Sequence, residues 1–369
     1  MRPRIQMAGL AGLVITSLAL AACSSGSSTG SAGSAGSTSG GTPAAGGAGT
    51  ELVVTSFGGD WEKAFIEAVV KPFEAETGAK VRLVTAYSAD ALTQLTAAKA
   101  KPQFDVVHFS GGQETKAAAD GLLAKMSESD LANAADLANV AKSGLAGGEG
   151  PVVQISPMGI MYRTDKITTA PTSWKDVLKP EYSKHVALTD LSNSYGLYSL
   201  LGVNSALGGD LTNIKPGMDA LTGLAKSGNA IVIKTSAEMQ QAFSARDIWI
   251  APYSQDYAET LRKASLPVEF VVPSEGATAS FITANLVANR PNTELAKKFI
   301  NAELKPEAQA KLAAALLYSP TNTKTVVPAE LATKVLSGDK LDTLTRYPSD
   351  TINTNRAAWT TLWNQGIAR

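Results

Sequence analysis

The chain has 369 residues, with 33 basic and 33 acidic side chains and a formal net charge of zero. This balance excludes the strongly basic face on which nucleic-acid binding depends. One cysteine and two histidines exclude an internal disulfide and leave too few ligands for a metal site made of these residues. The length is sufficient for two lobes of ordinary size.

The first 22 residues have the composition of an export signal. Arg2 and Arg4 give a positive start, and residues 7–22 are apolar but too short and too rich in small side chains for a membrane span. The run ends in Leu20-Ala21-Ala22-Cys23, which resembles the lipobox of bacterial lipoproteins. The resemblance implies cleavage before Cys23 and lipidation of its sulfur by a diacylglyceryl group, with acyl chains such as palmitate. The alternative is an ordinary secretory signal followed by an incidental cysteine.

Residues 24–50 are almost entirely Ser, Gly, Ala and Thr and carry no charge. Such a sequence cannot bury a core and predicts a flexible tether with a reach of roughly 25–30 Å. Cleavage removes two arginines and no acid, so the mature chain has 31 basic and 33 acidic residues and a net charge of −2. We expect residues 1–22 to be a signal peptide and residues 23–50 to be a lipidated tether. The folded part is then held at the extracytoplasmic face of the cell membrane, in a periplasm or on the outer surface.

Residues 51–86 predict the first unit of a parallel α/β sheet. A β-branched apolar run at 52–55 predicts a buried strand. Apolar side chains then recur at three- and four-residue steps over 61–73, which predicts an amphipathic helix, and a second strand is expected at 81–84. Pro72 lies inside the helical pattern and predicts a kink or a break.

The turn after the first strand has the side chains of a binding site. It offers the hydroxyl of Ser56, the bare backbone of Gly58 and the aromatic side chains of Phe57 and Trp61. Ligands of open α/β sheets bind beyond the carboxyl ends of the strands, where helix N-termini present free N–H groups. The alternative is a plain strand-to-helix turn, with Asp60 as the helix cap and both aromatic side chains in the core.

A second unit repeats this arrangement. A helix is expected at 89–100 with Ser88 as its N-cap, followed by a strand at 104–109 and the small-residue turn Ser110-Gly111-Gly112. Two such turns at one sheet edge strengthen the prediction of a binding rim. His108, just before the second turn, either faces that rim or packs within the sheet.

The rest of the chain continues the alternation of strands and helices. Strands are predicted at 152–163 (as one bent strand or two), 186–190, 230–233, 248–251 and 268–272. Helices are predicted from the second turn to about 120, at 171–178 as a short capped helix, from about 196 to 207, and at 214–227, 238–246, 292–301, 306–315 and 357–365.

Seven segments together resemble the extracellular solute-binding proteins of ABC importers, in the branch that includes spermidine/putrescine-binding proteins. They occur in the family's order and span nearly all of residues 51–369. They are KPFEAETGAKVRLV (71–84), FDVVHFSGG (104–112), ISPMGIMYRTDKI (155–167), TSWKDVLKPEYSKHVALTD (172–190), LPVEFVVPSEGA (266–277), LYSPTN (317–322) and RYPSDTI (346–352).

The resemblance implies an α/β fold of the two-lobed periplasmic-binding-protein type (type II), with a ligand cleft between lobes joined by crossing strands. Lobe 1 is expected to comprise residues 50–157 and 284–326, and lobe 2 residues 158–283 and 327–369. The implied function is that of a monomeric substrate-binding lipoprotein that delivers a small polar solute to a membrane permease with its ATPase. It implies no catalysis and no cofactor.

The resemblance also implies which side chains line the cleft. Aromatic side chains stack on flat or cationic groups, and hydroxyls and free amides orient polar atoms. The expected ligand-binding residues are Ser56, Phe57, Gly58, Trp61, Phe109, Ser110 and Gly111 from lobe 1, Asn193, Ser194, Tyr195, Tyr253, Ser254 and Asp256 from lobe 2, and Phe281, Ile282 and Thr283 at the crossover.

The sequence departs from the family's polyamine binders at the positions that hold ammonium groups. Where the family has acids after the strand that ends in Asp190, this chain has Leu191 and Ser194, and a Trp-x-Asp motif at the crossover is replaced by residues 282–284. A buried cation without a paired anion costs several kcal/mol. The sequence therefore favours a smaller polar, zwitterionic or mildly anionic solute, although Asp190, Asp256 and Asp60 remain as nearby acids.

Three other functions are less well supported by the residues. A ferric-ion binder of this superfamily would be expected to have adjacent tyrosines, and here Tyr195 and Tyr253 have tyrosine neighbours only three and four residues away. A hydrolase would need a nucleophile and a base, and the Gly-x-Ser-x-Gly turn is absent. A surface lipoprotein that senses the ligand for a receptor stays open as an alternative to import.

Overall fold

The computed structural model describes residues 49–245, 248–332, 334–338, 341, 344 and 347–367. The predicted signal peptide, the lipidation site Cys23 and the tether up to residue 48 lie outside these ranges. Within them, no helix has both the length and the apolar character needed to cross a bilayer.

One mixed sheet runs through the described residues, in the order β2-β1-β3-β9-β4-β7-β5-β6, with β8 and β10 each paired to β4. The strands are β1 (Glu51–Ser56), β2 (Lys80–Thr85), β3 (Val106–Phe109), β4 (Val152–Arg163), β5 (Val186–Thr189), β6 (Ala230–Ile233), β7 (Ile250–Ser254), β8 (Val268–Val271), β9 (Thr278–Leu286) and β10 (Ser319–Pro320).

Two groups of parallel strands form the ends of this sheet. β1 is parallel to β2 and β3, and β5 is parallel to β6 and β7. Between the groups, β9 and β4 run antiparallel to each other and to their outer neighbours. β4 pairs with β9 up to Met158 and with β7 from Met158 onward, so it crosses from one group to the other. Lobe 1 contains β2, β1 and β3, and lobe 2 contains β7, β5 and β6; the predicted two-lobed α/β fold is confirmed.

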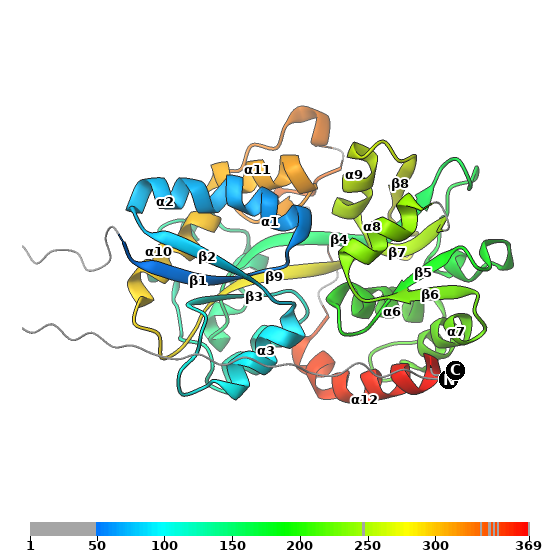
Figure 1. The fold of residues 1–369 in the computed structure, drawn as a ribbon, viewed down its shortest axis with the longest axis horizontal. Coiled ribbons are helices and arrows are strands. Elements are labelled where there is room, and N and C mark those ends of the chain that lie inside the picture. Colours follow the sequence, from blue (N-terminus) through cyan, green and yellow to red (C-terminus); the bar gives the residue numbers. More distant parts are fainter. Residues whose placement is uncertain are drawn as a thin grey trace, which may run out of the picture. The chain divides into compact units, whose positions relative to one another are not determined.

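Helices cover both faces of each lobe (Figure 1). In this view α1, α2 and α11 lie on one side of lobe 1 and α3 on the other, while α8 and α9 lie opposite α6 and α7 in lobe 2. The helices are α1 (Gly59–Phe65), α2 (Lys71–Thr77), α3 (Ser88–Ala97), α4 (Gln113–Ala119), α5 (Asn139–Lys142), α6 (Ser194–Ala206), α7 (Lys215–Lys226), α8 (Ser236–Ser244), α9 (Gln255–Lys263), α10 (Thr293–Glu303), α11 (Pro306–Leu316) and α12 (Ser349–Ile367).

Each lobe has its own apolar core. Phe65 and Phe299 belong to a core of lobe 1, whereas Trp174 and Trp363 belong to a core of lobe 2, so the C-terminal helix α12 completes lobe 2. Phe281, which the predicted limits assign to lobe 2, packs in the lobe 1 core because β9 crosses there. The residue limits of the lobes stay a prediction.

Where a kink or a break was predicted at Pro72, the chain stays helical but its hydrogen-bond pattern changes. α1 ends at Phe65, residues Ile66–Val70 form a π-helical segment, and α2 begins at Lys71. Proline has no N–H, and its ring clashes with the carbonyl one turn earlier, so a wider turn before it removes both problems. The helical segments on both sides of the π-helical turn keep apolar side chains buried, including Phe65 and Phe73.

Four elements were not predicted from the sequence: the short α5 and β10, and the longer α9 and β9. α9 has few apolar side chains, since five of its nine residues are Gln, Asp, Glu, Arg or Lys. β9 is buried at every position, so it lacks the alternation that marks a half-exposed strand.

Two expected helix caps are wrong. Ser88 is the first residue of α3 and Tyr87 is its N-cap, because the Ser88 hydroxyl lies 3.2 Å from that of Ser110 rather than capping its own helix. Asp60, offered as a cap of the first helix, lies in its first turn and bonds Lys63 at 2.8 Å, while Gly58 is the N-cap. Gly58 has φ +73°, which favours glycine.

His108 packs within the sheet of lobe 1, as one of its two predicted placements had it. It is fully buried on β3, and its ring nitrogens lie 2.9 Å from the Thr55 carbonyl and 3.0 Å from a carboxylate oxygen of Glu303 on α10. Because both partners are acceptors, the doubly protonated ring satisfies both. Burial lowers the pKa of His108, but Glu303 and the Thr55 carbonyl raise it by more. The pKa of His108 is therefore above its ordinary value. The pair supports the wall behind Trp61, whose ring centroid is 5.5 Å from that of His108.

We expect Glu303→Gln to lower the free energy of unfolding by about 3 kcal/mol, because it leaves a buried imidazole without its anion. The loss should be largest below pH 6.5, where the raised pKa of His108 contributes fully, and should shrink as the pH rises through that raised pKa. Urea unfolding at several pH values measures it. Glu294→Gln, on the exposed side of the same helix, is the matched control, and equal losses in both variants would contradict the assignment.

Candidate functional site

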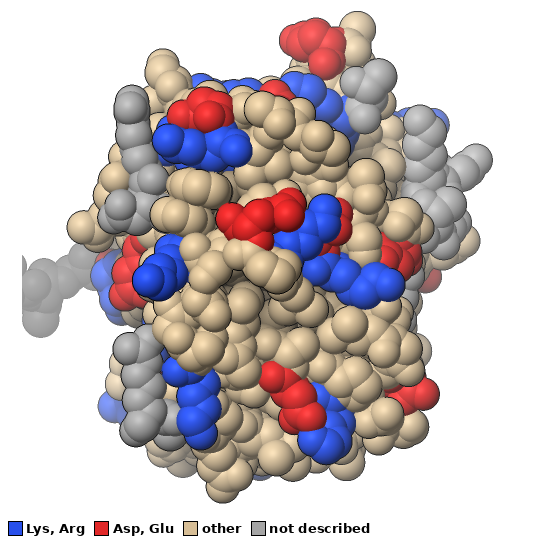
Figure 2. Space-filling view, turned by 90° about the vertical axis from the view of Figure 1, so that its right-hand side faces the viewer, with Lys and Arg blue, Asp and Glu red and all other residues tan. Residues whose placement is uncertain are grey.

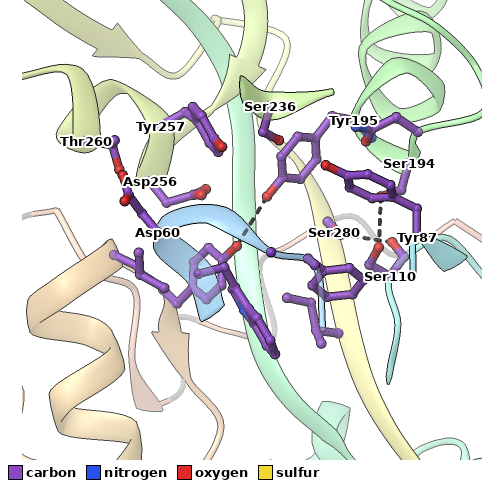
Figure 3. Close-up of a pocket in the computed structure, with 17 residues that line it drawn as sticks. Asp60, Tyr87, Ser110, Ser194, Tyr195, Ser236, Asp256, Tyr257, Thr260 and Ser280 are labelled. Carbon is purple, nitrogen blue, oxygen red and sulfur yellow. Dashed lines mark hydrogen bonds between the residues drawn. The ribbon is translucent and has the colours of Figure 1, made fainter. Parts of the chain in front are cut away.

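A pocket lies between the lobes, where the carboxyl ends of the parallel strands of both groups face one another (Figure 3). Its empty volume is about 530 Å³, counted to the open mouth. The lining residues are Phe57, Gly58, Asp60, Trp61, Tyr87, Ser110, Asn193, Ser194, Tyr195, Ser236, Asp256, Tyr257, Thr260, Ser280, Ile282, Leu316 and Tyr318.

Most of the lining comes from the segments directly after parallel strands. In lobe 1, residues 57–61 follow β1, Tyr87 follows β2 and Ser110 follows β3. In lobe 2, the segments after β5, β6 and β7 supply the start of α6, the start of α8 and the first turns of α9. Since strands of one parallel group end at the same edge, six separate segments converge on one cavity.

Aromatic rings form much of the wall. Phe57 and Trp61 pack edge to face with centroids 5.1 Å apart, and the indole N–H of Trp61 donates to Gln154 of β4 at 3.0 Å. On the side of lobe 2, the ring of Tyr253 lies 5.0 Å from that of Tyr195 and 5.1 Å from that of Tyr257. Such faces bind flat or cationic groups.

Hydroxyl groups connect the lobes across the pocket. The hydroxyls of Ser110 and Ser194 lie 2.8 Å apart, and those of Tyr195 and Tyr318 lie 3.2 Å apart (Figure 3). Ser280 donates to the carbonyl of Ser110 at 2.8 Å. Burial raises the pKa of Tyr195 and of Tyr318, so both phenols stay protonated and can donate hydrogen bonds at physiological pH.

The charges of the pocket lining are negative. Asp60 and Asp256 contribute carboxylates, and none of the seventeen lining residues is Lys, Arg or His. Asp256 is only 4% exposed and accepts a hydrogen bond from Ser156 at 2.7 Å. Burial raises the pKa of Asp256 to about 6, against the lowering effect of the hydroxyls of Ser156, Ser254 and Tyr318. The pocket therefore holds a carboxylate that a positively charged group would stabilise.

Nine of the sixteen expected ligand-binding residues line this pocket. The nine are Phe57, Gly58, Trp61, Ser110, Asn193, Ser194, Tyr195, Asp256 and Ile282. Ligand contact by these residues stays a prediction.

The other seven predicted residues lie outside the lining, namely Ser56, Phe109, Gly111, Tyr253, Ser254, Phe281 and Thr283. Strand alternation explains the two residues of β9: Ser280 and Ile282 face the pocket, so Phe281 and Thr283 face away from it. Phe109 packs in the lobe 1 interior.

The remaining four support the lining from behind or beside it. The Ser56 hydroxyl accepts from the backbone N–H of Gly58 at 2.9 Å and donates to Glu62 at 2.6 Å. The phenol of Tyr253 lies 2.9 Å from the Ser236 hydroxyl, and Ser254 is fully buried at the end of β7. Gly111 adjoins the lining, since a Cβ atom there would lie 3.2 Å from Cβ of Ser194.

Sequence reasoning missed seven lining residues and treated Asp60 only as a nearby acid. The seven are Tyr87, Ser236, Tyr257, Thr260, Ser280, Leu316 and Tyr318. Tyr87 and Ser236 follow the ends of β2 and β6, so the rule that identified the turns after β1 and β3 would have found them. Thr260 lies one helical turn beyond Asp256 on the unpredicted helix α9. Leu316 and Tyr318 come from the end of α11 and carried no local signal.

Neither histidine lines the pocket. His108 is bound by Glu303 and Thr55, and the His185 ring stacks on Trp249 with centroids 3.7 Å apart. Within the described ranges, no three or more His, Cys, Asp or Glu side chains gather as a metal site would require. The arrangement provides aromatic faces, hydroxyls and carboxylates, which are groups for binding.

Two α/β lobes with a pocket at the facing strand ends define a periplasmic-type solute-binding protein. The chain belongs to the bacterial extracellular solute-binding protein family, whose model matches residues 68–336. The crystal structure of an ABC transporter protein from Clostridium perfringens ATCC 13124 superimposes with a TM-score of 0.69 at 26% identity, covering 86% of this chain and 100% of that one.

Two curated relatives are named for polyamines. The chain is 27% identical over 177 residues to the spermidine/putrescine-binding periplasmic protein of Escherichia coli (strain K12), covering 48% of each protein. It is 25% identical over 284 residues to the spermidine/putrescine-binding periplasmic protein 1 of Haemophilus influenzae, covering 73% of this chain and 77% of that protein. The match thus spans about half the length of the first relative.

Asp256 predicts a pH dependence of stability. Because its pKa is about 6 in the folded protein and 3.8 ordinarily, the folded state binds the proton more tightly, and stability falls as the pH rises through this window. The empty protein should therefore gain up to about 3 kcal/mol at pH 8 from Asp256→Asn, and this gain should vanish near pH 4.

Thermal unfolding of both proteins from pH 4 to pH 8 measures this difference. Asp90→Asn, at an exposed position on α3, is the control and should be neutral throughout. An Asp256→Asn protein that is less stable than the parent at pH 8 would contradict the buried carboxylate as a source of strain.

Proposed function

We propose that this protein is the solute-binding component of an ABC importer and that it captures a small organic cation, with at least one ammonium group, between its lobes. The observation that carries the proposal is the pocket's charge: the carboxylates of Asp60 and Asp256 face a lining without a basic side chain. Asp60 is paired with Lys63 at 2.8 Å, but no basic side chain lies beside Asp256 in the lining. An anionic solute would therefore meet a buried carboxylate with no cation to offset it. Of the solute classes left open by the sequence, the anionic one is therefore disfavoured.

The position of Asp256 explains how an ammonium group would be recognised. A carboxylate that is 4% exposed and bonded by Ser156 is costly to ionise in an empty pocket. A cation restores the charge balance, and the rings of Tyr195 and Tyr257 beside it offer faces for cation–π contact. Serine hydroxyls from both lobes orient the remaining polar atoms.

The relatives support the class of solute more than its identity. Two are named for binding spermidine and putrescine, and both of those compounds are organic cations. The carboxylates of this chain do not stand at the positions that hold ammonium groups in the family's polyamine binders. We therefore propose that the solute is a cation with an ammonium group. Its length is limited by the size of this pocket.

Transfer to a permease with its ATPase, without catalysis, completes the proposed function. Binding between two lobes couples ligand capture to closure, and a closed form is a state that a permease can distinguish from an open one. The two histidines are held away from the pocket hydroxyls, which leaves no serine–histidine pair in the lining.

A thermal-shift panel tests the solute class. A bound solute raises the midpoint of unfolding by mass action, so we expect a shift with amines such as putrescine, agmatine or choline and none with citrate or phosphate. Asp256→Asn should weaken binding of the active amine on the order of 100-fold or more, because the buried charge partner is removed. Asp90→Asn should leave it unchanged. Shifts by anions alone would contradict the proposal.

We also propose that Cys23 anchors the protein through acyl chains at the outer side of the cell membrane. Labelling of cells with radioactive palmitate should mark the parent protein and leave Cys23→Ser unlabelled. The variant should also leave the membrane fraction, since one residue carries the acyl groups. Membrane association that is equal in both proteins would contradict the anchor.

A further inference from the structure

The C-terminal helix α12 belongs to lobe 2 by its packing. Ile352, Trp359 and Trp363 are buried in the lobe 2 core, and the indole N–H of Trp363 donates to Asp190 at 3.1 Å. Asp190 directly follows β5. The second half of α12 is thus fixed to the strand group of lobe 2.

The first half of α12 reaches the other lobe. Asn353 donates from its side-chain amide to the carbonyl of Gly112 at 2.6 Å, and the Arg356 guanidinium donates to the carbonyl of Gly111. Both carbonyls belong to the turn after β3, which places Ser110 in the pocket. In Figure 1 α12 extends along one side of the molecule from α7 toward lobe 1. The turn that places Ser110 in the pocket from lobe 1 is therefore held by a helix of lobe 2.

The Arg356 contact has an electrostatic partner in lobe 1. Burial lowers the pKa of Arg356, while Tyr198 and Glu114 raise it. Glu114 lies in the first turn of α4 and is only 2% exposed. The guanidinium thus bonds a carbonyl of lobe 1 and is stabilised by the charge of a buried carboxylate of the same lobe, although it is carried by lobe 2. Separation of the lobes would remove both interactions at once.

A second contact joins the lobes on the opposite side of the pocket. Lys263, at the end of α9, donates to the carbonyl of Ala315 at 2.7 Å. This carbonyl belongs to the last turn of α11, where a positive side chain interacts favourably with the free carbonyl groups. α9 carries Asp256 of the pocket, and Tyr318 follows α11. The two contacts therefore flank the site, and none of Asn353, Arg356 and Lys263 lines it.

We propose that Asn353 and Arg356 are positioning residues of the solute site: they fix the Ser110–Gly112 turn from the opposite lobe and, with Lys263, hold the lobes closed. Affinity for solute then depends on side chains that do not touch it, because only the closed fraction of the protein has a complete pocket. The proposal rests on solute binding between the lobes, and it is independent of the chemical class of the solute.

We call the contacts of Asn353, Arg356 and Lys263 with the opposite lobe the latch. Small-angle X-ray scattering of the purified protein without added solute tests the latch directly. We expect Asn353→Ala/Arg356→Ala to have a larger radius of gyration than the parent, because the closed form loses its contacts. Thr354→Ala is the control, because Thr354 is exposed on the same helix and its hydroxyl donates to the Asp350 carbonyl within that helix. Its radius of gyration should match that of the parent. Lys263→Ala should shift the radius in the same direction as the double variant.

The outcomes separate a latch from mere support of the fold. A lower unfolding temperature with an unchanged radius would show a structural role and overturn the proposal. Equal radii in all proteins, whether all compact or all extended, would overturn it as well. Should the double variant not fold, Asn353→Ala and Lys263→Ala carry the same test. Because no solute is added, the result stands whether or not the amine panel identifies a ligand.

In the presence of an amine that shifts the parent protein, the latch also predicts a kinetic signature. The double variant should bind more weakly, in proportion to its loss of closed form, mainly through faster dissociation of that amine. Thr354→Ala should keep the parent rate. Unchanged dissociation in the double variant would contradict a role of α12 in holding the closed form.

Discussion

The facing carboxyl ends of two parallel strand groups are the arrangement on which the rest of the structure depends. β4 and β9 run between the groups, so the turns after β1 and β3 meet those after β5 and β7 across one pocket. Turns at strand ends leave backbone N–H groups and short side chains free for a ligand. No single segment makes the site, and each lobe supplies an incomplete half. A solute in this pocket would contact both lobes, and in the proposed function its binding is coupled to their closure.

In the proposed function, a buried carboxylate gives this pocket its selectivity. Asp256 lies among tyrosines and accepts a hydrogen bond from Ser156. Burial raises the pKa of Asp256 to about 6. Such a group makes the empty pocket costly at neutral pH and makes a cation favourable there, because the ligand supplies the charge that the protein lacks. The aromatic wall adds contact area without adding charge. Affinity and specificity then arise from the same feature, a buried negative charge that has no cationic partner in the empty pocket.

Much of the fold followed from patterns in the chain. The strand at 52–55 and the two-lobed class are present in the structure, because they rest on local periodicity and on the family's segments. At Pro72 the helix continues through a π-helical turn instead of the expected kink or break. The helix α9 was not predicted, because its sequence has too few apolar residues to show a helical pattern. The sheet continues from one lobe into the other, so it does not test the predicted residue limits of the lobes.

The site was harder to predict, for physical reasons. Ser110 and Ser194 could each be found at a strand end, but the 2.8 Å contact between them depends on how the lobes meet. Phe281 was chosen in place of Ser280 because a fully buried strand gives no sign of which face is which. Asp256 was expected in the cleft, but its burial, on which the proposed preference for a cation rests, depends on side chains from several segments. On the face seen in Figure 2, basic and acidic groups lie beside one another, so surface charge gave no hint of an acidic pocket.

The most direct measurement is the proton released when a permanently charged amine such as choline binds at pH 6, obtained by calorimetry in buffers of different ionisation enthalpy. With a pKa of about 6, Asp256 is half protonated when the pocket is empty, and a bound cation requires it to ionise. The account predicts release of about half a proton per amine bound, and none in Asp256→Asn. Binding without proton release, or uptake of a proton with an anionic solute, would contradict it.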